Sequence, residues 1–230
     1  GDGDACIAGS ERVAGPWRRV QPGDAPAGLR DVDNVWVADG PSDQRVFGLW
    51  ELRGDSIVPW VLARTPNWDL DPAAPDIRRD WYVYESTSRP RKGPRKKLFN
   101  VPGYPLGVEP DNPLLGVDSG RLTGFSPGEL RGAILRGECS GMMHYPEAAE
   151  VLDYDPDTRV LTSNYPRYRD DPTTGSRYYL EGRPAFLDRP GEYLAVSNRL
   201  FVCMDEGEDA NERAFEAGIR THGIVIEETG

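Results

Sequence analysis

The chain has 230 residues, of which 38% are hydrophobic and 10% aromatic, enough for one large β domain or two small ones. Its formal net charge of −11 argues against general nucleic-acid binding, and no apolar run reaches the ~18 residues of a membrane-spanning helix. The 26 glycines and 21 prolines break long helices and suit short strands joined by turns. We therefore predict an all-β fold.

The three cysteines, Cys6, Cys139 and Cys203, permit one disulfide and leave an odd thiol, with the pairing open. They form no CxxC pattern, and the two histidines, His144 and His222, lie far apart in the sequence. We predict no metal site and no cofactor. The chain begins without Met or a signal segment, so we expect a processed product or a piece of a longer protein.

Residues 1–34 are rich in Gly, Asp and Pro, with Trp17 as the one large anchor, which predicts an extended arm. Residues 35–40 predict a short strand that runs into a turn. Residues 45–52 and 56–63 flank an Arg-Gly-Asp triplet and predict a hairpin, because the triplet has turn chemistry. That chemistry accounts for the triplet better than an adhesion motif does.

Pro59 places the second strand of this hairpin at a sheet edge or a bulge. Residues 81–85 predict a strand that leads into a basic segment, residues 89–97, and residues 97–101 predict the strand that leaves it. Ser126-Pro-Gly-Glu129 is a capping box and predicts a short helix or helical turn.

Residues 149–155 and 159–164 predict a second hairpin. Residues 176–193 predict two strands hinged on Pro190 and Gly191. Residues 209–217 predict a brief helix or the first corner of a coil, and residues 223–228 a last strand.

Four segments resemble, in the same order, motifs of extracellular right-handed parallel β-helix proteins, some of them glycoside-hydrolase-like. They are Val-Trp-Val-Ala-Asp-Gly (35–40), Leu-Ala-Arg-Thr-Pro-Asn-Trp (62–68), Phe-Ser-Pro-Gly-Glu-Leu-Arg-Gly-Ala-Ile-Leu-Arg (125–136) and Tyr-Tyr-Leu-Glu…Phe-Leu-Asp-Arg-Pro-Gly-Glu-Tyr (178–193). The last motif is the most specific. Gly182 and Thr65 depart from the family pattern, and residues 89–97 have no counterpart in it.

The resemblance implies a β-rich domain inserted beside the start of a β-helix, the part that carries the catalytic carboxylates in the glycoside-hydrolase-like members. Together with the composition, it leads us to expect an arm over residues 1–34, an antiparallel sandwich or barrel-like domain with long loops over residues 35–208, and the start of a β-helix rung over residues 209–230. It also implies an extracellular or cell-surface location.

Arg64, Asn67 and Trp68 are candidates for a sugar-binding groove, because guanidinium and amide groups fix hydroxyls and an indole stacks on a sugar face. The alternative is a turn at residues 65–67, with Arg64 paired to an acidic side chain.

The basic segment predicts an anion-binding loop, for an anionic polysaccharide or the acidic face of a neighbouring subunit. It lacks the Gly-Arg-Pro core of a minor-groove hook, so nucleic acid is not the predicted partner. The alternative is a solvated loop. Its charged residues are Arg89, Arg91, Lys92, Arg95, Lys96 and Lys97.

Asp188 and Glu192 could form a glycosidase-like carboxylate pair, but a Pro-Gly turn accounts for every residue around them. Cys139 and His144 could hint at a thiol nucleophile without a partner acid at fixed spacing. We assign no catalytic residue. The predicted function is a non-catalytic, extracellular, carbohydrate-associated or assembly module. The alternatives are part of a polysaccharide-cleaving hydrolase or lyase whose β-helix lies outside this chain, and an anion-binding interaction protein.

Overall fold

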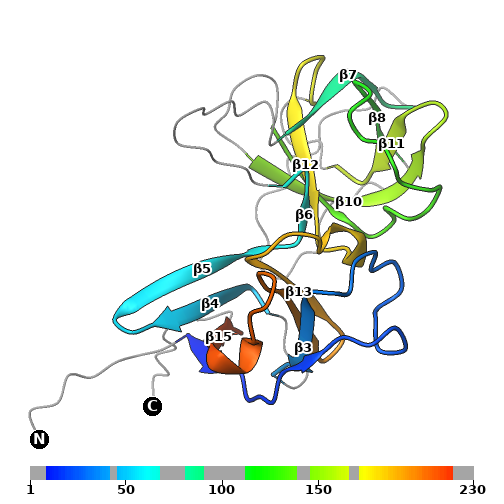
Figure 1. The fold of residues 1–230 in the computed structure, drawn as a ribbon. Helices are drawn as coiled ribbons and strands as arrows, with labels where there is room; N and C mark the ends of the chain where they lie inside the picture. The colour runs from blue at the N-terminus through cyan, green and yellow to red at the C-terminus, as the bar shows by residue number, and fades with distance from the viewer. Residues whose placement is uncertain are drawn as a thin grey trace, which may run out of the picture. The chain divides into compact units, whose positions relative to one another are not determined.

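The computed structural model describes residues 9–41, 46–67, 81–90, 112–138, 146–165 and 171–219, which form strands joined by turns (Figure 1). The helical pieces among them are two three-residue 3-10 turns, η1 (Pro184–Phe186) and η2 (Ala210–Glu212). The prediction of an all-β fold is confirmed. No helix in the described part of the chain is long and apolar enough to cross a membrane.

The chain divides into two compact units. The first comprises Gly1–Ala63 and Pro184–Gly230, and the second comprises Arg64–Arg183. The second unit is thus an insertion into the first. Its two boundaries fall inside the motifs at residues 62–68 and 178–193, whereas the sequence analysis drew boundaries after residues 34 and 208.

The first unit contains an eight-stranded sheet in the order β1-β15-β4-β5-β13-β14-β3-β2. Its strands pair antiparallel except β5 and β13, which run parallel. The strand bounds are β1 (Ser10–Arg12), β2 (Arg18–Arg19), β3 (Val35–Asp39), β4 (Gly48–Arg53), β5 (Ser56–Leu62), β13 (Glu192–Val196), β14 (Arg199–Cys203) and β15 (Ala214–Gly218).

The described part of the N-terminal arm belongs to this sheet. β1 pairs with β15 and β2 pairs with β3. Trp17 is buried and packs edge to face against Phe215, with ring centroids 5.2 Å apart. An indole of this size stabilises the unit by the apolar area it removes from water. Toward the other end of the chain, β15 pairs antiparallel with β1 and β4, and residues 220–230 lie outside the described residues.

The β4–β5 hairpin forms around the Arg-Gly-Asp triplet, and its turn uses the positive φ of Gly54 (+57°). β13 pairs only with the end of β5, at Val61 and Leu62, so Pro59 lies in the edge part of this strand. Val61, with 40% of its area exposed, and Ile57, with 67%, share one face of β5 because side chains alternate along a strand.

The second unit contains a seven-stranded sheet in the order β6-β12-β7-β8-β11-β10-β9, and an additional β12–β9 pairing closes six of its strands into a barrel. All its pairings are antiparallel, which confirms the predicted barrel-like domain. The bounds are β6 (Arg64–Thr65), β7 (Tyr82–Ser88), β8 (Leu114–Asp118), β9 (Ile134–Glu138), β10 (Pro146–Asp155), β11 (Val160–Ser163) and β12 (Arg177–Glu181).

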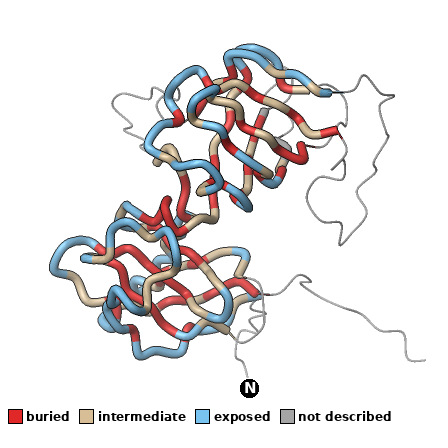
Figure 2. Tube along the Cα trace, turned by 90° about the vertical axis from the view of Figure 1, so that its right-hand side faces the viewer, coloured by how far each residue is buried: buried red, intermediate tan, exposed pale blue. Residues whose placement is uncertain are grey.

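Tyrosine rings occupy much of the barrel core. Figure 2 shows buried stretches along the strands and exposed residues in the turns. Tyr84 and Tyr178 are buried and stack with centroids 4.4 Å apart, and Gly116 on β8 leaves room for the Tyr84 ring. Burial, followed by the negative charge of Asp118, raises the pKa of Tyr178. The same two causes raise the pKa of Tyr84, so both rings stay neutral at physiological pH.

Asp118 is a fully buried carboxylate at the end of β8. Its Oδ2 accepts a 2.7 Å hydrogen bond from the hydroxyl of Tyr178. Its Oδ1 accepts from the backbone N–H groups of Gly120, Arg121 and Leu122 at 2.7 to 2.8 Å. These bonds offset the desolvation of the charge, so Asp118 is a structural group that ties a turn to the barrel wall.

The capping box forms a turn rather than a helix. The backbone N–H of Ser126 donates to Oε2 of Glu129 at 2.9 Å, as the motif predicts. Gly128 and Gly132 have φ of +77° and +79°, which is incompatible with a continuing helix. The hairpin predicted at residues 149–164 is present as β10 and β11.

Candidate functional site

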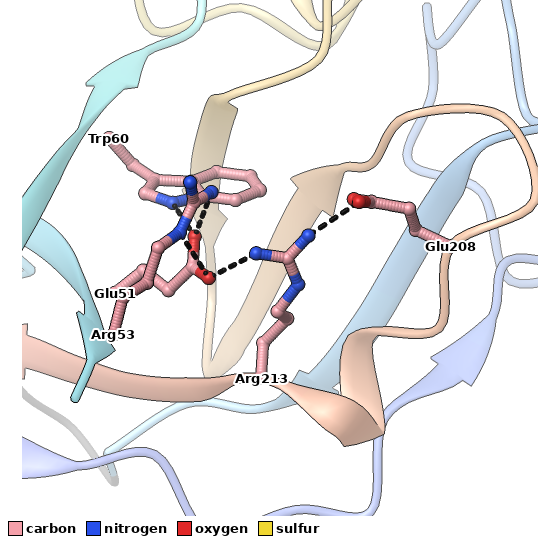
Figure 3. A network of polar contacts seen from close by, with 5 residues as sticks. All are labelled: Glu51, Arg53, Trp60, Glu208 and Arg213. Carbon is pink, nitrogen blue, oxygen red and sulfur yellow. Dashed lines mark hydrogen bonds and ion pairs between the residues drawn. The ribbon is translucent and has the colours of Figure 1, made fainter.

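Glu51 is the centre of a polar network in the first unit (Figure 3). Its side chain is 1% exposed, yet it carries a carboxylate. Arg53 donates to both of its oxygens at 2.8 Å, and the indole N–H of Trp60 donates to Oε2 at 3.2 Å. The network begins within one hairpin, because the register Glu51↔Val58 and Leu49↔Trp60 places Glu51 and Trp60 diagonally on one face.

Arg213 extends this network to a distant part of the chain. Arg213 directly follows η2, and the side chain of the N-cap residue Asp209 accepts a hydrogen bond from the backbone N–H of Asn211. Its guanidinium donates to Oε1 of Glu51 and to Oε1 of Glu208, both at 2.5 Å. Burial favours the neutral form of Glu51, but hydrogen bonds from Arg53, Arg213 and Trp60 outweigh it and lower its pKa. Glu51 is therefore held as an anion, unsuited to act as a general acid.

A hollow of about 460 Å³ lies beside this network. Its volume is within the roughly 300–1,000 Å³ typical of small-molecule sites. Three segments of the first unit form it: the β4–β5 hairpin, the turn before β13 and the turn after β14. Its lining residues are Arg53, Val58, Pro59, Trp60, Arg189, Pro190, Gly191, Asp205 and Glu208.

A second group of aromatic and basic side chains occurs in the second unit, on the outward-facing side of β12. Trp81 and Tyr179 are both partly exposed and pack edge to face with centroids 5.1 Å apart. The guanidinium of Arg64 lies 3.9 Å from the Tyr179 ring centroid, and that of Arg177 lies 5.5 Å from the Trp81 ring centroid. We call these four residues the β12 platform.

Arg64 is buried, whereas a residue that binds sugar in a groove is expected to be exposed. Its residue is 2% exposed, its Nε donates to the carbonyl of Pro66 at 3.0 Å, and its guanidinium covers the Tyr179 ring. It therefore positions Tyr179 and the segment leading to Asn67. Asn67 is partly exposed, and Trp68 lies outside the described residues.

Arg89 is the one described residue of the basic segment's charged set, and it is engaged within the protein. Its side chain is 4% exposed and donates to the carboxylate of Asp171 and to the carbonyls of Asn112 and Tyr165. It anchors the base of the segment and so differs from the exposed anion contact expected of it. Arg91, Lys92, Arg95, Lys96 and Lys97 lie outside the described residues.

Glu192 is an internal hydrogen-bond acceptor of the Pro-Gly turn at residues 190–191. Glu192 is 3% exposed, and its Oε2 accepts from the backbone N–H groups of Asp188 and Arg189 at 3.3 Å. Cys203 is a free, buried thiol whose pKa is raised to about 12 by burial and then by nearby acids. Cys6, Cys139 and His144 lie outside the described residues. Within the described ranges, no group of acids, cysteines or histidines could hold a metal ion.

The candidate residues predicted from the sequence did not include Glu51, Trp60, Glu208 or Arg213. The predicted hairpin contained a signal for Glu51 and Trp60. Once the turn fixes the register, the alternation of side chains along each strand places these two residues on the same face. No local signal indicated Arg213, which is separated from Glu51 by 162 positions.

The chain is similar in fold to a solved structure named glycoside hydrolase, with a TM-score of 0.56 and 15% sequence identity. The match covers 92% of this chain and 31% of that one, so the chain spans about a third of that protein's length. No protein-family model matches the sequence, and no curated protein matches it.

Proposed function

We propose that this chain is a non-catalytic, carbohydrate-associated module of a larger extracellular β-helix protein, and that it binds polysaccharide through the β12 platform. The observation that carries the proposal is the Trp81–Tyr179 pair, partly exposed and lined by arginines. An aromatic face accommodates the C–H face of a sugar ring, and Arg177, which is partly exposed, offers guanidinium donors to its hydroxyls. The buried Arg64 holds the Tyr179 ring in place. Asn67, which is partly exposed and lies three positions after Arg64, is part of the proposed contact surface.

The fold likeness supports the carbohydrate part of the proposal. The similar structure is named glycoside hydrolase, and this chain matches only 31% of it. A module of that relative size fits a role beside a catalytic part outside this chain. The competing proposal, a polysaccharide-cleaving enzyme whose site needs the missing part, predicts new reducing ends when a longer natural chain, and not this one, is incubated with a glycan.

Replacing Trp81 by alanine should weaken polysaccharide binding about tenfold, which corresponds to ~1.4 kcal/mol and to the loss of one aromatic contact. Affinity electrophoresis against a panel of plant and bacterial polysaccharides measures the change. Phe47→Ala is the matched control, because Phe47 is an aromatic residue of the other unit with 51% of its area exposed. Equal retardation of wild type and Trp81→Ala, or no retardation by any polysaccharide, would refute the proposal.

An assembly role is the second candidate, and the exposed apolar face of β5 favours it. Ile57 and Val61 present 67% and 40% of their areas to solvent beside the edge proline Pro59. The part of β5 before Val61 has no strand beside it on the β13 side among the described residues. Exposed strand edges with apolar side chains readily pair with other chains.

If this face self-associates, sedimentation should show a concentration-dependent dimer that Ile57→Lys abolishes. Val58→Lys is unsuitable as a control, because Val58 lines the hollow. Glu11→Lys, an exposed change on β1, should leave the dimer intact. A wild-type chain that stays monomeric at all concentrations rules out assembly between copies.

A further inference from the structure

We propose that the hollow of the first unit is a second binding site, and that its ligand is a neutral saccharide. The proposal does not depend on the β12 platform, because every residue of the hollow belongs to the other unit. It rests on three features of the hollow: its open hydrogen-bonding atoms, its apolar wall and its balanced charge.

The first feature is a set of polar atoms left open within a rigid frame. Arg53 uses Nε and Nη2 on Glu51, while its Nη1 makes no hydrogen bond to the described residues. Oε1 of Glu208 accepts a hydrogen bond from Arg213. Oε2 of Glu208 and the carboxylate of Asp205 accept no hydrogen bond from the described residues. The hollow thus offers a fixed donor and several acceptors, and hydroxyl groups satisfy both.

The second feature is the apolar wall that faces these atoms. Val58, Pro59, Trp60 and Pro190 line the same hollow. Trp60 is held by its indole N–H bond to Glu51 and by edge-to-face packing on Phe215, with centroids 5.1 Å apart. A ligand that fits therefore has an apolar face and hydroxyls at its rim, and a pyranose ring has both.

The third feature is the charge. The network and the hollow together carry three arginines and three carboxylates. Since these charges balance, an anionic or a cationic ligand gains no net attraction, and a neutral one meets no repulsion. The charged residues of the network and the hollow are Arg53, Arg189, Arg213, Glu51, Asp205 and Glu208.

Titration of the chain with neutral cello-, xylo- and malto-oligosaccharides, followed by tryptophan fluorescence and calorimetry, tests the proposal. One of these series should bind with an affinity that is the same at low and high salt, because the interaction is not ionic. Oligogalacturonate, an anionic probe of similar size, should bind at least tenfold more weakly. Tighter binding of the anionic probe would overturn the inference.

Asp205→Ala should weaken binding at least fivefold, and it removes a side chain without a hydrogen-bond partner among the described residues. Glu206→Ala is the matched control, because this neighbouring carboxylate is exposed and does not line the hollow. Trp60→Leu should abolish binding, and Asp205→Ala keeps the test decisive if that variant fails to fold.

Trp81→Ala separates the two sites. Binding that survives Trp81→Ala and is weakened by Asp205→Ala supports the hollow. Binding lost in Trp81→Ala and unchanged in Asp205→Ala supports the β12 platform and overturns this inference. Absence of binding by every neutral oligosaccharide overturns it as well, whatever the platform binds.

Discussion

Replacing Gly116 by alanine should lower the free energy of unfolding of the barrel by about 3 kcal/mol, at the upper end of the usual range for overpacking. A Cβ at this position would lie 2.2 Å from Cε1 and 2.6 Å from Cδ1 of Tyr84. The ring cannot retreat, because it is 1% exposed and stacked on Tyr178 at 4.4 Å. Urea denaturation followed by far-UV circular dichroism measures the change.

Gly23→Ala is the control for this substitution. A Cβ added at Gly23 would meet no atom within 4 Å, and the φ of Gly23 lies outside the left-handed region, so its replacement should be neutral. A second-site change, Tyr84→Leu in the Gly116→Ala background, should recover part of the lost stability because it removes the clashing ring edge. Wild-type stability in Gly116→Ala would show that the barrel interior is looser than the stacked tyrosines indicate.

Glu51→Gln should destabilise the first unit by about 2–3 kcal/mol. Breaking a fully buried ion pair costs ~3–5 kcal/mol, and we expect less here because the side chain of Arg53 is 52% exposed. The amide keeps one acceptor oxygen, but its NH₂ group faces a guanidinium, so Arg53 and Arg213 lose their shared counter-charge. Thermal unfolding followed by tryptophan fluorescence reports the loss through Trp60.

The same substitution should change how stability depends on pH. The pKa of folded Glu51 lies below its unfolded value of 4.5, so the unfolded state binds a proton more readily. The stability contributed by Glu51 is present above pH 4.5 and is lost as the pH falls through the lower, folded pKa. Glu51→Gln should flatten this acid limb, and Glu206→Gln, an exposed change, should not. Parallel acid limbs for wild type and Glu51→Gln would contradict the pKa argument.

The strands and turns followed closely from the sequence. The Arg-Gly-Asp turn and the turn between residues 149–155 and 159–164 specify local backbone geometry, which depends on neighbouring residues only. The same reasoning predicted a helical turn at Ser126, where the capping bond formed but Gly128 and Gly132 ended the segment.

The candidate sites were harder to predict from the sequence than the strands and turns. The sequence named Arg64 as a candidate, but its burial against Tyr179 arises because β12 pairs with β6. Asn67 was proposed as a sugar-binding residue only because of the residues beside it in the sequence. The Glu51 network needs Arg213, and charge patterning in the sequence gives no information about which of many arginines meets a particular carboxylate.

The sequence by itself determined that this protein is built of short strands, and where the hairpins of β4–β5 and β10–β11 turn. The two strands predicted to hinge on Pro190 and Gly191 are β12 and β13, which belong to different sheets. Only the tertiary structure decided that six strands between residues 64 and 183 close into a barrel, that this unit interrupts the chain of the other one, and which polar side chains line a hollow. The physical reason is range. Turn and strand preferences act over a few residues. Barrel closure pairs Tyr178 with Gly137, and the buried ion pair joins Glu51 to Arg213 across 162 positions, so only the folded chain brings these residues together.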